Sequence, residues 1–332
     1  MTEQELSLVA FTAQGARLMG ALQRSLGGEA VFSKDVPDFS LADWTEERFA
    51  SRQALVFVGA AGIAVRAIAP HIKSKAQDPA VVAVDEAGRF VIPLLSGHLG
   101  GANALAQRIA AICGGTAVIT TATDINGLWA VDLWAKAQGL TVVQPERIKL
   151  VSGKLLQGDT VSIYSRWPIA GEPPAGVAVS STDRADVIVD LYDHGQGLHL
   201  APKVGVLGLG CRRGTPGAAL EEAFCKFCSR RALLSAAISQ AASIDVKSDE
   251  AGLRDFCRAH SWPLSFFTAT ELAACSGSFT PSAFVERTVG VDNVCERSAV
   301  LASGGELLET KYAGDGVTMA LACTVPQLDW SW

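Results

Sequence analysis

The segment between Pro93 and Asn103 carries the residue types that proton transfer and anion binding require. An apolar run before it predicts a strand, and a striped apolar run after it predicts a helix. Glycines at the break let a ligand approach the backbone closely, and a helix N-terminus presents unpaired N–H groups to an anion or oxyanion. His98 can move a proton near neutral pH, so the segment is a candidate site. The alternative is a glycine turn with a structural histidine. The candidate residues are Ser96, Gly97, His98, Gly100, Gly101 and Asn103.

Two further strand ends carry small or polar residues that suit a ligand site. Gly59 and Gly62 follow a buried apolar strand, and Arg66 lies one turn into the next helix. Thr121 and Asp124 follow a later strand, where Asp124 is either a site carboxylate or the N-cap of the next helix. Ligands of open α/β sheets bind at the carboxyl ends of the strands. Both turns and the histidine segment are therefore expected to line one crevice.

The glycine-rich segment Gly208–Gly214 separates a predicted strand from a predicted helix. It is similar to a dinucleotide-binding turn, but its third glycine is one position late and no strand-end acid follows at the usual distance. An anion site fits better, because Arg212 and Arg213 carry permanent charge beside a helix N-terminus. The alternative is a tight turn with two solvated arginines. Cys211 lies beside the arginines, which favour a thiolate, but the sequence offers no base for a nucleophilic role.

Cys225 and Cys228 form a C-x-x-C pair inside a predicted helix. A zinc site needs a second pair at ligand spacing, and the sequence shows none. Core thiols are expected at both positions, and no metal site of the protein is predicted.

Strand-like and helix-like runs alternate over residues 1–143, which predicts a mostly parallel sheet with helices on both faces. The run ends with a helix expected over 125–138. Segments shorten over 144–202, where prolines and glycines interrupt them, so a smaller mixed module is expected there. The α/β rhythm resumes at residue 203. The expected fold class is α/β, with two α/β domains, 1–143 and 203–325, joined by the middle module.

Composition excludes several classes of protein. The 332 residues are 49% hydrophobic and 19% charged, and the net charge of −6 gives no electrostatic case for nucleic-acid binding. Charged residues interrupt every apolar run before it reaches membrane-spanning length. The acidic start of the chain lacks the basic region of a secretory signal. The eight cysteines are therefore expected as reduced thiols in a cytoplasm.

Together these segments resemble the cobalt-precorrin-5A hydrolase family of anaerobic cobalamin (vitamin B12) biosynthesis, the CbiG proteins. The resemblance covers most of the chain from about Leu55 onward and is weakest before it and in the middle module. Its most specific parts are Gly59–Arg66, Pro93–Asn103, Thr120–Asp124, Gly208–Gly214 and Val294–Glu296.

The resemblance implies a hydrolase that acts on a carbon–carbon bond of a cobalt corrinoid. The substrate carries a δ-lactone that joins a ring-A acetate to the methylated meso carbon C20. The enzyme opens the lactone and releases acetaldehyde, which gives cobalt-precorrin-5B. The cobalt belongs to the substrate, so no cofactor is expected. Neighbouring enzymes of cobalamin and porphyrin metabolism are candidate partners.

This chemistry assigns expected roles to the candidate residues. His98 is expected as base or proton shuttle, with Asp85 or Asp124 as its orienting carboxylate. N–H groups over Gly97–Gly101 are expected to bind the acyl oxyanion, and basic side chains the carboxylate arms of the macrocycle. The residues expected to contact substrate are Gly59, Gly62, Arg66, Ser96, Gly97, Gly100, Gly101, Asn103, Thr121, Gly208, Gly210, Cys211, Arg212, Arg213 and Lys311.

Two other functions stay open from the sequence. A non-catalytic carrier of corrinoid intermediates would bind them tightly and release no acetaldehyde. An α/β oxidoreductase would bind a nicotinamide cofactor at the turn that begins with Gly208.

Overall fold

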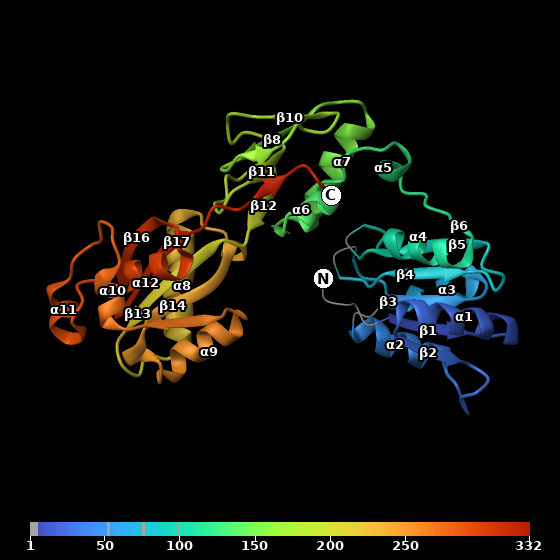
Figure 1. Ribbon diagram of the computed structural model, residues 1–332, viewed down its shortest axis with the longest axis horizontal. Helices are drawn as coiled ribbons and strands as arrows, with labels where there is room; N and C mark the ends of the chain where they lie inside the picture. The colour runs from blue at the N-terminus through green and yellow to red at the C-terminus, as the bar shows by residue number, and fades with distance from the viewer. Residues whose placement is uncertain (1–5, 52–53, 75–76, 99) are drawn as a thin grey trace. The chain divides into compact units, whose positions relative to one another are not determined.

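The computed structural model describes residues 6–51, 54–74, 77–98 and 100–332. The chain divides into two compact units, Met1–Leu133 and Trp134–Trp332 (Figure 1). The first unit contains a six-stranded sheet in the order β2-β1-β3-β4-β5-β6. Its strands are β1 (Leu6–Ala10), β2 (Glu29–Phe32), β3 (Ala54–Val58), β4 (Val81–Val84), β5 (Phe90–Leu95) and β6 (Thr116–Ala117).

Helices cover both faces of this sheet. They are α1 (Ala13–Leu26), α2 (Leu41–Ser51), α3 (Ala61–Ile68) and α4 (Ala102–Cys113). Leu22 of α1 and Ile109 of α4 share one buried cluster with the sheet. Trp44 of α2 and Ile68 of α3 share a second cluster on the other face. The first unit is therefore a three-layer α/β structure.

The direction of the strands changes once across the sheet. Strands β1 to β4 are parallel, but β5 pairs antiparallel with β4 after the turn Asp85–Gly88. Strand β6 then pairs parallel with β5. As a result, β5 and β6 end at the edge where β3 and β4 begin. The sheet thus has two distinct rims at which strands end, and loops on one rim cannot meet loops on the other.

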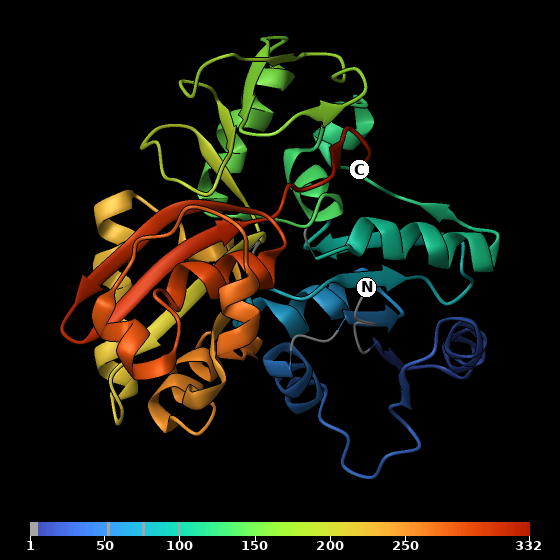
Figure 2. The same ribbon diagram turned by 60° about the vertical axis from the view of Figure 1, so that its left-hand side comes forward.

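The second unit contains two five-stranded sheets, in the orders β10-β8-β11-β12-β7 and β15-β14-β13-β17-β16. In the second of these, the long strands β16 and β17 run antiparallel side by side, as the red ribbons of Figure 2 show. The strands are β7 (Leu140–Val142), β8 (Val161–Ser165), β10 (Val177–Val179), β11 (Val187–Val189), β12 (Leu198–Pro202), β13 (Gly205–Cys211), β14 (Ile238–Ile244), β15 (Leu264–Phe267), β16 (Glu306–Gly314) and β17 (Val317–Cys323). The helices are α7 (Ile148–Leu156), α8 (Gly217–Arg231), α9 (Ala251–Ala259), α10 (Ala269–Ala274), α11 (Ala283–Val289) and α12 (Cys295–Ser303).

The end of the chain returns to the part of the second unit that precedes residue 203. Strand β18 (Leu328–Asp329) pairs with β9 (Ile169–Ala170). The Trp330 ring stacks on Trp134 with centroids 5.6 Å apart, and the indole N–H of Trp134 donates to the Asp329 carbonyl at 2.7 Å. Aromatic stacking and a partly buried hydrogen bond therefore hold this segment in place.

The predicted α/β fold class is confirmed, and most predicted elements lie where they were expected. The helix expected over 125–138 is wrong, because the chain forms α5 (Ala122–Ile125) and α6 (Val131–Ala137) with a break between them. Gly127 in this break has a φ of 58°, which ends helical geometry. The strand that the sequence predicts before Thr121 is limited to β6. The domain limits after residues 143 and 202 stay a prediction. Among the described residues, no helix is long and apolar enough to cross a membrane.

Candidate functional site

The turn between β5 and α4 is built by its own glycines. Ser96 has a φ of 57° and Gly101 a φ of 86°. A Cβ on Gly97 would lie 2.7 Å from Oδ1 of Asn103, and one on Gly100 would lie 2.4 Å from Cβ of Ser96. Glycine is therefore required at both positions to close the turn. Leu99, in the same turn, lies outside the described residues.

The backbone N–H groups of this turn are partly used inside it. Gly101 donates to the carbonyl of His98 at 2.9 Å, Ala102 to Ser96 at 3.1 Å, and Asn103 to Gly97 at 3.0 Å. Of the oxyanion donors that the sequence predicts over Gly97–Gly101, the Gly101 N–H is thus already committed to the His98 carbonyl. Oxyanion binding by the other N–H groups of this stretch stays a prediction.

His98 lies between two carboxylates. Its Nε2 is 2.8 Å from Oδ2 of Asp124, and its Nδ1 is 3.5 Å from Oδ2 of Asp132. The side chains of His98 and Asp132 are 13% and 10% exposed, against 32% for Asp124. The bond to Asp132 is the largest influence on the His98 pKa; with Asp124 it outweighs the opposing effect of burial and raises that pKa to about 9.

Asn103 fixes the position of Asp124. Its buried Nδ2 donates to Oδ2 of Asp124 at 2.9 Å and to Oγ1 of Thr121 at 3.1 Å. The same carboxylate oxygen therefore accepts from Asn103 and contacts His98. The expected neighbours His98, Asn103, Thr121 and Asp124 all meet at this rim of the sheet.

The electrostatics of the cluster favour a proton donor. A pKa of about 9 keeps the imidazole protonated at neutral pH. Both ring nitrogens then carry an N–H, and the ring can give up one of these two protons. The expectation of His98 as a resting base is therefore not supported by its surroundings. Its role as a shuttle that first gives a proton and then takes one back is compatible with them.

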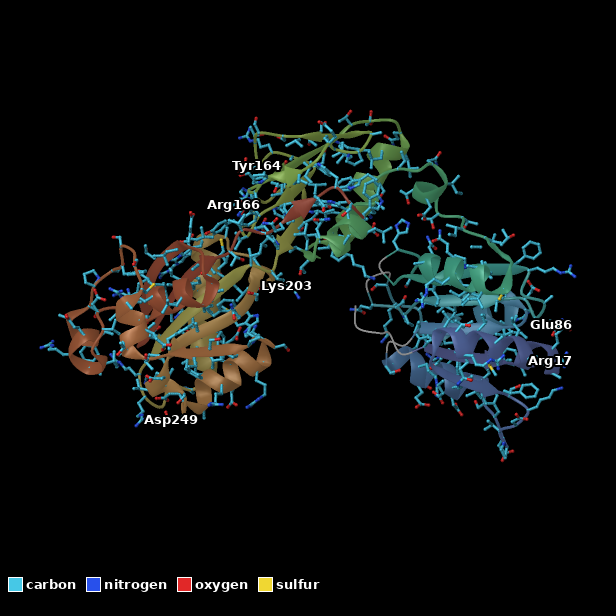
Figure 3. The ribbon with its side chains drawn as sticks, viewed as in Figure 1. Arg17, Glu86, Tyr164, Arg166, Lys203 and Asp249 are labelled. Carbon is cyan, nitrogen blue, oxygen red and sulfur yellow. The ribbon has the colours of Figure 1, made fainter. Side chains whose placement is uncertain are left out.

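Asp85 does not join this cluster. Its Oδ1 accepts from the Ala87 amide at 2.9 Å and its Oδ2 from the Phe90 amide at 2.6 Å, which closes the turn between β4 and β5. Because β5 runs back along β4, this turn lies at the opposite rim from His98. Glu86, labelled in Figure 3, belongs to the same turn. The prediction that Asp85 orients His98 is therefore wrong.

The rim of the first sheet at which Asp85 lies also carries Gly59, Gly62 and Arg66. Gly59 directly follows β3, which is parallel to β4, and the Arg66 guanidinium reaches back to 4.0 Å from the Cβ position of Gly62. The expected single crevice with His98 is wrong, because the reversal of β5 carries His98 to the other rim. Contact of these three residues with substrate stays a prediction.

Asp132 is the site residue that the sequence did not reveal. A continuous helix over 125–138 would place it two turns from Asp124. The break after Ile125 instead lets α6 start afresh at Val131, and the Oδ2 of Asp132 lies against His98. The sequence feature that could have predicted this break is Gly127, because glycine ends helices more often than it continues them.

Gly208 and Gly210 lie within strand β13 and make no turn. A Cβ on Gly208 would lie 1.7 Å from the carbonyl oxygen of Cys295, and one on Gly210 would lie 2.5 Å from Oγ1 of Thr318. The first glycine therefore lets α12 pack directly on the sheet. The expected glycine turn at these positions is wrong, and with it the dinucleotide reading loses its structural basis.

The two arginines after β13 differ in their partners. Arg213 pairs with Asp249 at 3.0 Å and with Glu250 at 3.6 Å; Asp249 is labelled in Figure 3. The exposed Arg212 has no carboxylate within 4.0 Å among the described residues. Burial raises the pKa of Cys211, which disfavours a nucleophilic thiolate. Arg212 is therefore the better placed of the two to bind an anion.

Lys311 lies next to a buried carboxylate. Its amide donates to Oε1 of the fully buried Glu296 at 2.6 Å, and its Nζ is 3.4 Å from the carbonyl of Thr280. Glu296 also accepts from the Thr280 amide at 2.6 Å and from Asn293 at 2.9 Å. This network anchors the backbone around Lys311. Binding of substrate by its ammonium group stays a prediction.

Cys225 and Cys228 are free thiols on α8. Burial raises the pKa of Cys228 to about 12. Within the described ranges, no three histidine, cysteine, aspartate or glutamate side chains form a group that could hold a metal ion.

Comparisons with known proteins agree along the chain. Residues 43–124 match the family described as Cobalamin synthesis G N-terminal, residues 129–190 match Cobalamin biosynthesis central region, and residues 205–322 match Cobalamin synthesis G C-terminus. A crystal structure of a cobalamin biosynthesis protein G homolog from Sulfolobus solfataricus has 22% identity over 96% of this chain and 97% of that chain, with a TM-score of 0.40.

Two relatives cover most of the sequence. The cobalt-precorrin-5A hydrolase of Salmonella typhimurium is 34% identical over 303 residues, which is 86% of this chain and 86% of the relative. The cobalt-precorrin-5A hydrolase of Priestia megaterium is 31% identical over 297 residues, which is 82% of this chain and 79% of the relative. The chain therefore belongs to the cobalt-precorrin-5A hydrolase (CbiG) family of cobalamin biosynthesis.

Proposed function

We propose that this protein opens the δ-lactone of cobalt-precorrin-5A and releases acetaldehyde, which gives cobalt-precorrin-5B. The relatives named cobalt-precorrin-5A hydrolase support the substrate and the hydrolase role. The single observation that carries the chemistry is the position of His98 between Asp124 and Asp132, whose carboxylates raise its pKa to about 9. The cobalt ion is part of the substrate, and no protein-bound cofactor is proposed.

The first step is hydrolysis of the ester bond. Water attacks the lactone carbonyl and gives its proton to Asp124, the more exposed carboxylate of the pair. The bond between the acyl carbon and the C20 oxygen breaks, and the His98 imidazolium donates its proton to that leaving oxygen. The ring-A acetate and a C20 hydroxyl group result. Two carboxylates beside the imidazole stabilise its charged form before this transfer.

The second step breaks the carbon–carbon bond. Neutral His98 takes the proton from the C20 hydroxyl as its oxygen becomes the carbonyl of acetaldehyde. The electron pair of the broken bond passes to the macrocycle carbon, and His98 gives that carbon the proton it took from the hydroxyl. One water molecule is consumed overall, and the protonated His98 is restored when Asp124 returns the first proton.

A hollow on the rim of the first sheet where His98 lies offers room for part of a ligand. It has a volume of about 330 Å³ and is lined by residues that include Phe49, His71, Lys73 and Asp78. The carbonyl of Asp78 accepts a hydrogen bond from the Ser96 hydroxyl at 2.9 Å, which links this hollow to the catalytic turn. Pockets of this size are typical of sites for small ligands.

The test is incubation of the purified protein with cobalt-precorrin-5A and measurement of acetaldehyde. We expect release by the native protein and loss of release by His98→Ala. Unchanged release by the variant would contradict the role of His98. Tight binding of the corrinoid without acetaldehyde would identify a carrier of corrinoid intermediates instead.

A further inference from the structure

A second hollow lies in the part of the chain between β7 and β13, and the proposed chemistry does not use it. It has a volume of about 450 Å³ and opens between α7 and the loops that precede β11 and β12. Its lining includes Arg147, Leu150, Lys154, Arg184, Asp186 and Leu198. We call it the basic hollow, because three of its side chains are cationic and one is anionic.

The single carboxylate of the basic hollow is already saturated. Oδ1 of Asp186 pairs with the Lys154 ammonium at 2.6 Å, and Oδ2 accepts from the amide and the hydroxyl of Ser162, both at 2.9 Å. Burial opposes ionisation of Asp186, but the bonds from Lys154 and Ser162 outweigh it and lower the pKa of that carboxyl. Asp186 is therefore ionised and neutralises only Lys154.

Arg147 keeps its charge while its position is fixed. Its guanidinium donates to the carbonyl oxygens of Gly195 and Gly197, which are neutral acceptors. These bonds tie the loop before β12 to the start of α7. An arginine held in this way is preorganised to bind an anion without further loss of side-chain entropy.

Arg184 is the most available cation of the basic hollow. It is exposed, and among the described residues no carboxylate lies within 4.0 Å of its guanidinium. With Arg147 it leaves two uncompensated positive charges in a protein whose net charge is −6. Carboxylates and phosphates are the groups that such paired guanidinium forks bind best.

The wall of the basic hollow also presents apolar surface. Leu150 on α7 is 62% exposed and lies one helical turn before Lys154, so both face the same side of the helix. Leu198, which is 1% exposed, lies beneath this wall. A ligand that matches the whole lining has an apolar body with carboxylate groups at its edge.

We propose that the basic hollow binds carboxylate arms at one edge of a tetrapyrrole-type macrocycle, with Arg147 and Arg184 as the anion ligands and Leu150 against the ring. The inference rests on the proposed function for the identity of this ligand as the cobalt-corrinoid substrate. The shared chemistry is a carboxylate group, which a small free polycarboxylate would also supply.

The binding experiment uses uroporphyrin, a stable macrocycle with acetate and propionate arms, and follows it by isothermal titration calorimetry. We expect Arg184→Glu to weaken its binding about tenfold or more, because a bidentate ion pair is replaced by like-charge repulsion. Arg184→Lys should recover part of the affinity. Lys149→Glu is the matched control: it makes the same charge change on α7 at an exposed residue outside the lining.

Each outcome decides between alternatives. Equal weakening by Arg184→Glu and Lys149→Glu would overturn the basic hollow as a site, because only net charge would matter. If citrate or inorganic phosphate displaces uroporphyrin at a concentration similar to that of uroporphyrin, the basic hollow is a site for small anions. That result would overturn the proposal that it binds a macrocycle. Arg147→Gln provides a second variant, and thermal unfolding of each variant confirms that it folds.

The acetaldehyde assay separates this inference from the proposed function. If the native protein releases acetaldehyde, Arg184→Glu should raise KM and leave kcat within about twofold. If the native protein releases none but still binds uroporphyrin in a manner that depends on Arg184, the proposed function fails and the basic hollow stands.

Discussion

Asp132 Oδ2 lies 3.5 Å from Nδ1 of His98, whereas Asp124 contacts the other ring nitrogen, Nε2. The second carboxyl oxygen of Asp132 accepts from the Leu133 amide at 3.1 Å at the start of α6. This bond orients the carboxylate toward the ring. The imidazole therefore has an acceptor at each nitrogen, and it binds its proton more tightly than an isolated histidine does.

Asp132→Asn should lower the pKa of His98 from about 9 toward 6.5, because the bond to Asp132 is the largest influence that raises it. The titration of the His98 ring protons by NMR measures this change. Asp85→Asn, at the other rim of the sheet, is the control and should leave the His98 pKa unchanged. A His98 pKa that stays near 9 in Asp132→Asn would show that Asp132 does not act on the ring.

The raised pKa of His98 also links folding to pH. The folded pKa of about 9 lies above the ordinary value of 6.5, so the folded protein binds the proton more tightly than the unfolded chain. The resulting stabilisation is fully present below about pH 6.5 and disappears as pH rises through about 9. We expect it to be about 2 kcal/mol, less than the full shift implies, because solvent screens the cluster.

Urea unfolding of the native protein and of His98→Gln at pH 6 and pH 9.5 measures this contribution. The difference in unfolding free energy between the two proteins should shrink at the higher pH. A difference that grows with pH would contradict the assigned direction of the pKa shift.

The alternation of apolar runs predicted the α/β fold and many strand limits, because buried strands such as β3 consist almost entirely of apolar residues. The expectation of a single crevice missed the reversal at β5. Only residues 85–89 separate β4 from β5, and a parallel crossover needs about a dozen residues or more, so the spacing favours a hairpin that carries the loop after β5 to the other rim.

Two kinds of error occur at the candidate site. Asp85 and His98 each follow an apolar strand, but the hairpin carries them to opposite rims. Gly208 has the same sequence pattern as a ligand-binding glycine, but its neighbour is the carbonyl of Cys295. A close approach of ligand and a close approach of a helix both require glycine, so the sequence alone cannot separate them.

Arg212→Ala should weaken substrate binding more than Arg213→Ala, because Arg213 is already paired with Asp249 and Glu250. We expect KM in the acetaldehyde assay to rise about three- to tenfold for Arg212→Ala, with little change in kcat. Arg258→Ala is the control: its exposed guanidinium pairs with Asp255 at 2.7 Å. If Arg212→Ala raises KM no more than the control does, the proposal of an anion site after β13 is contradicted.

Trp330→Ala should destabilise the second unit, because the indole is 8% exposed and stacks on Trp134. Loss of a packed tryptophan costs about 3 kcal/mol or more. Urea unfolding monitored by circular dichroism measures the cost. Trp332→Ala is the matched control, since that side chain is 50% exposed. Equal stability of the two variants would show that the C-terminal segment is not held by this stack.

Gly208→Ala distinguishes the packing role of this glycine from a role in binding. The added Cβ would lie 1.7 Å from the Cys295 carbonyl and 2.9 Å from Cβ of Ala299, so α12 must move away from the sheet. Overpacking of this kind costs about 3 kcal/mol or more when backbone must shift. We therefore expect a clear fall in Tm.

Gly153→Ala, on α7, is the control: its Cβ position has no atom within 4 Å, and alanine in a helix should raise Tm slightly. A Gly208→Ala protein that keeps its Tm but loses corrinoid binding would instead assign this glycine to the ligand.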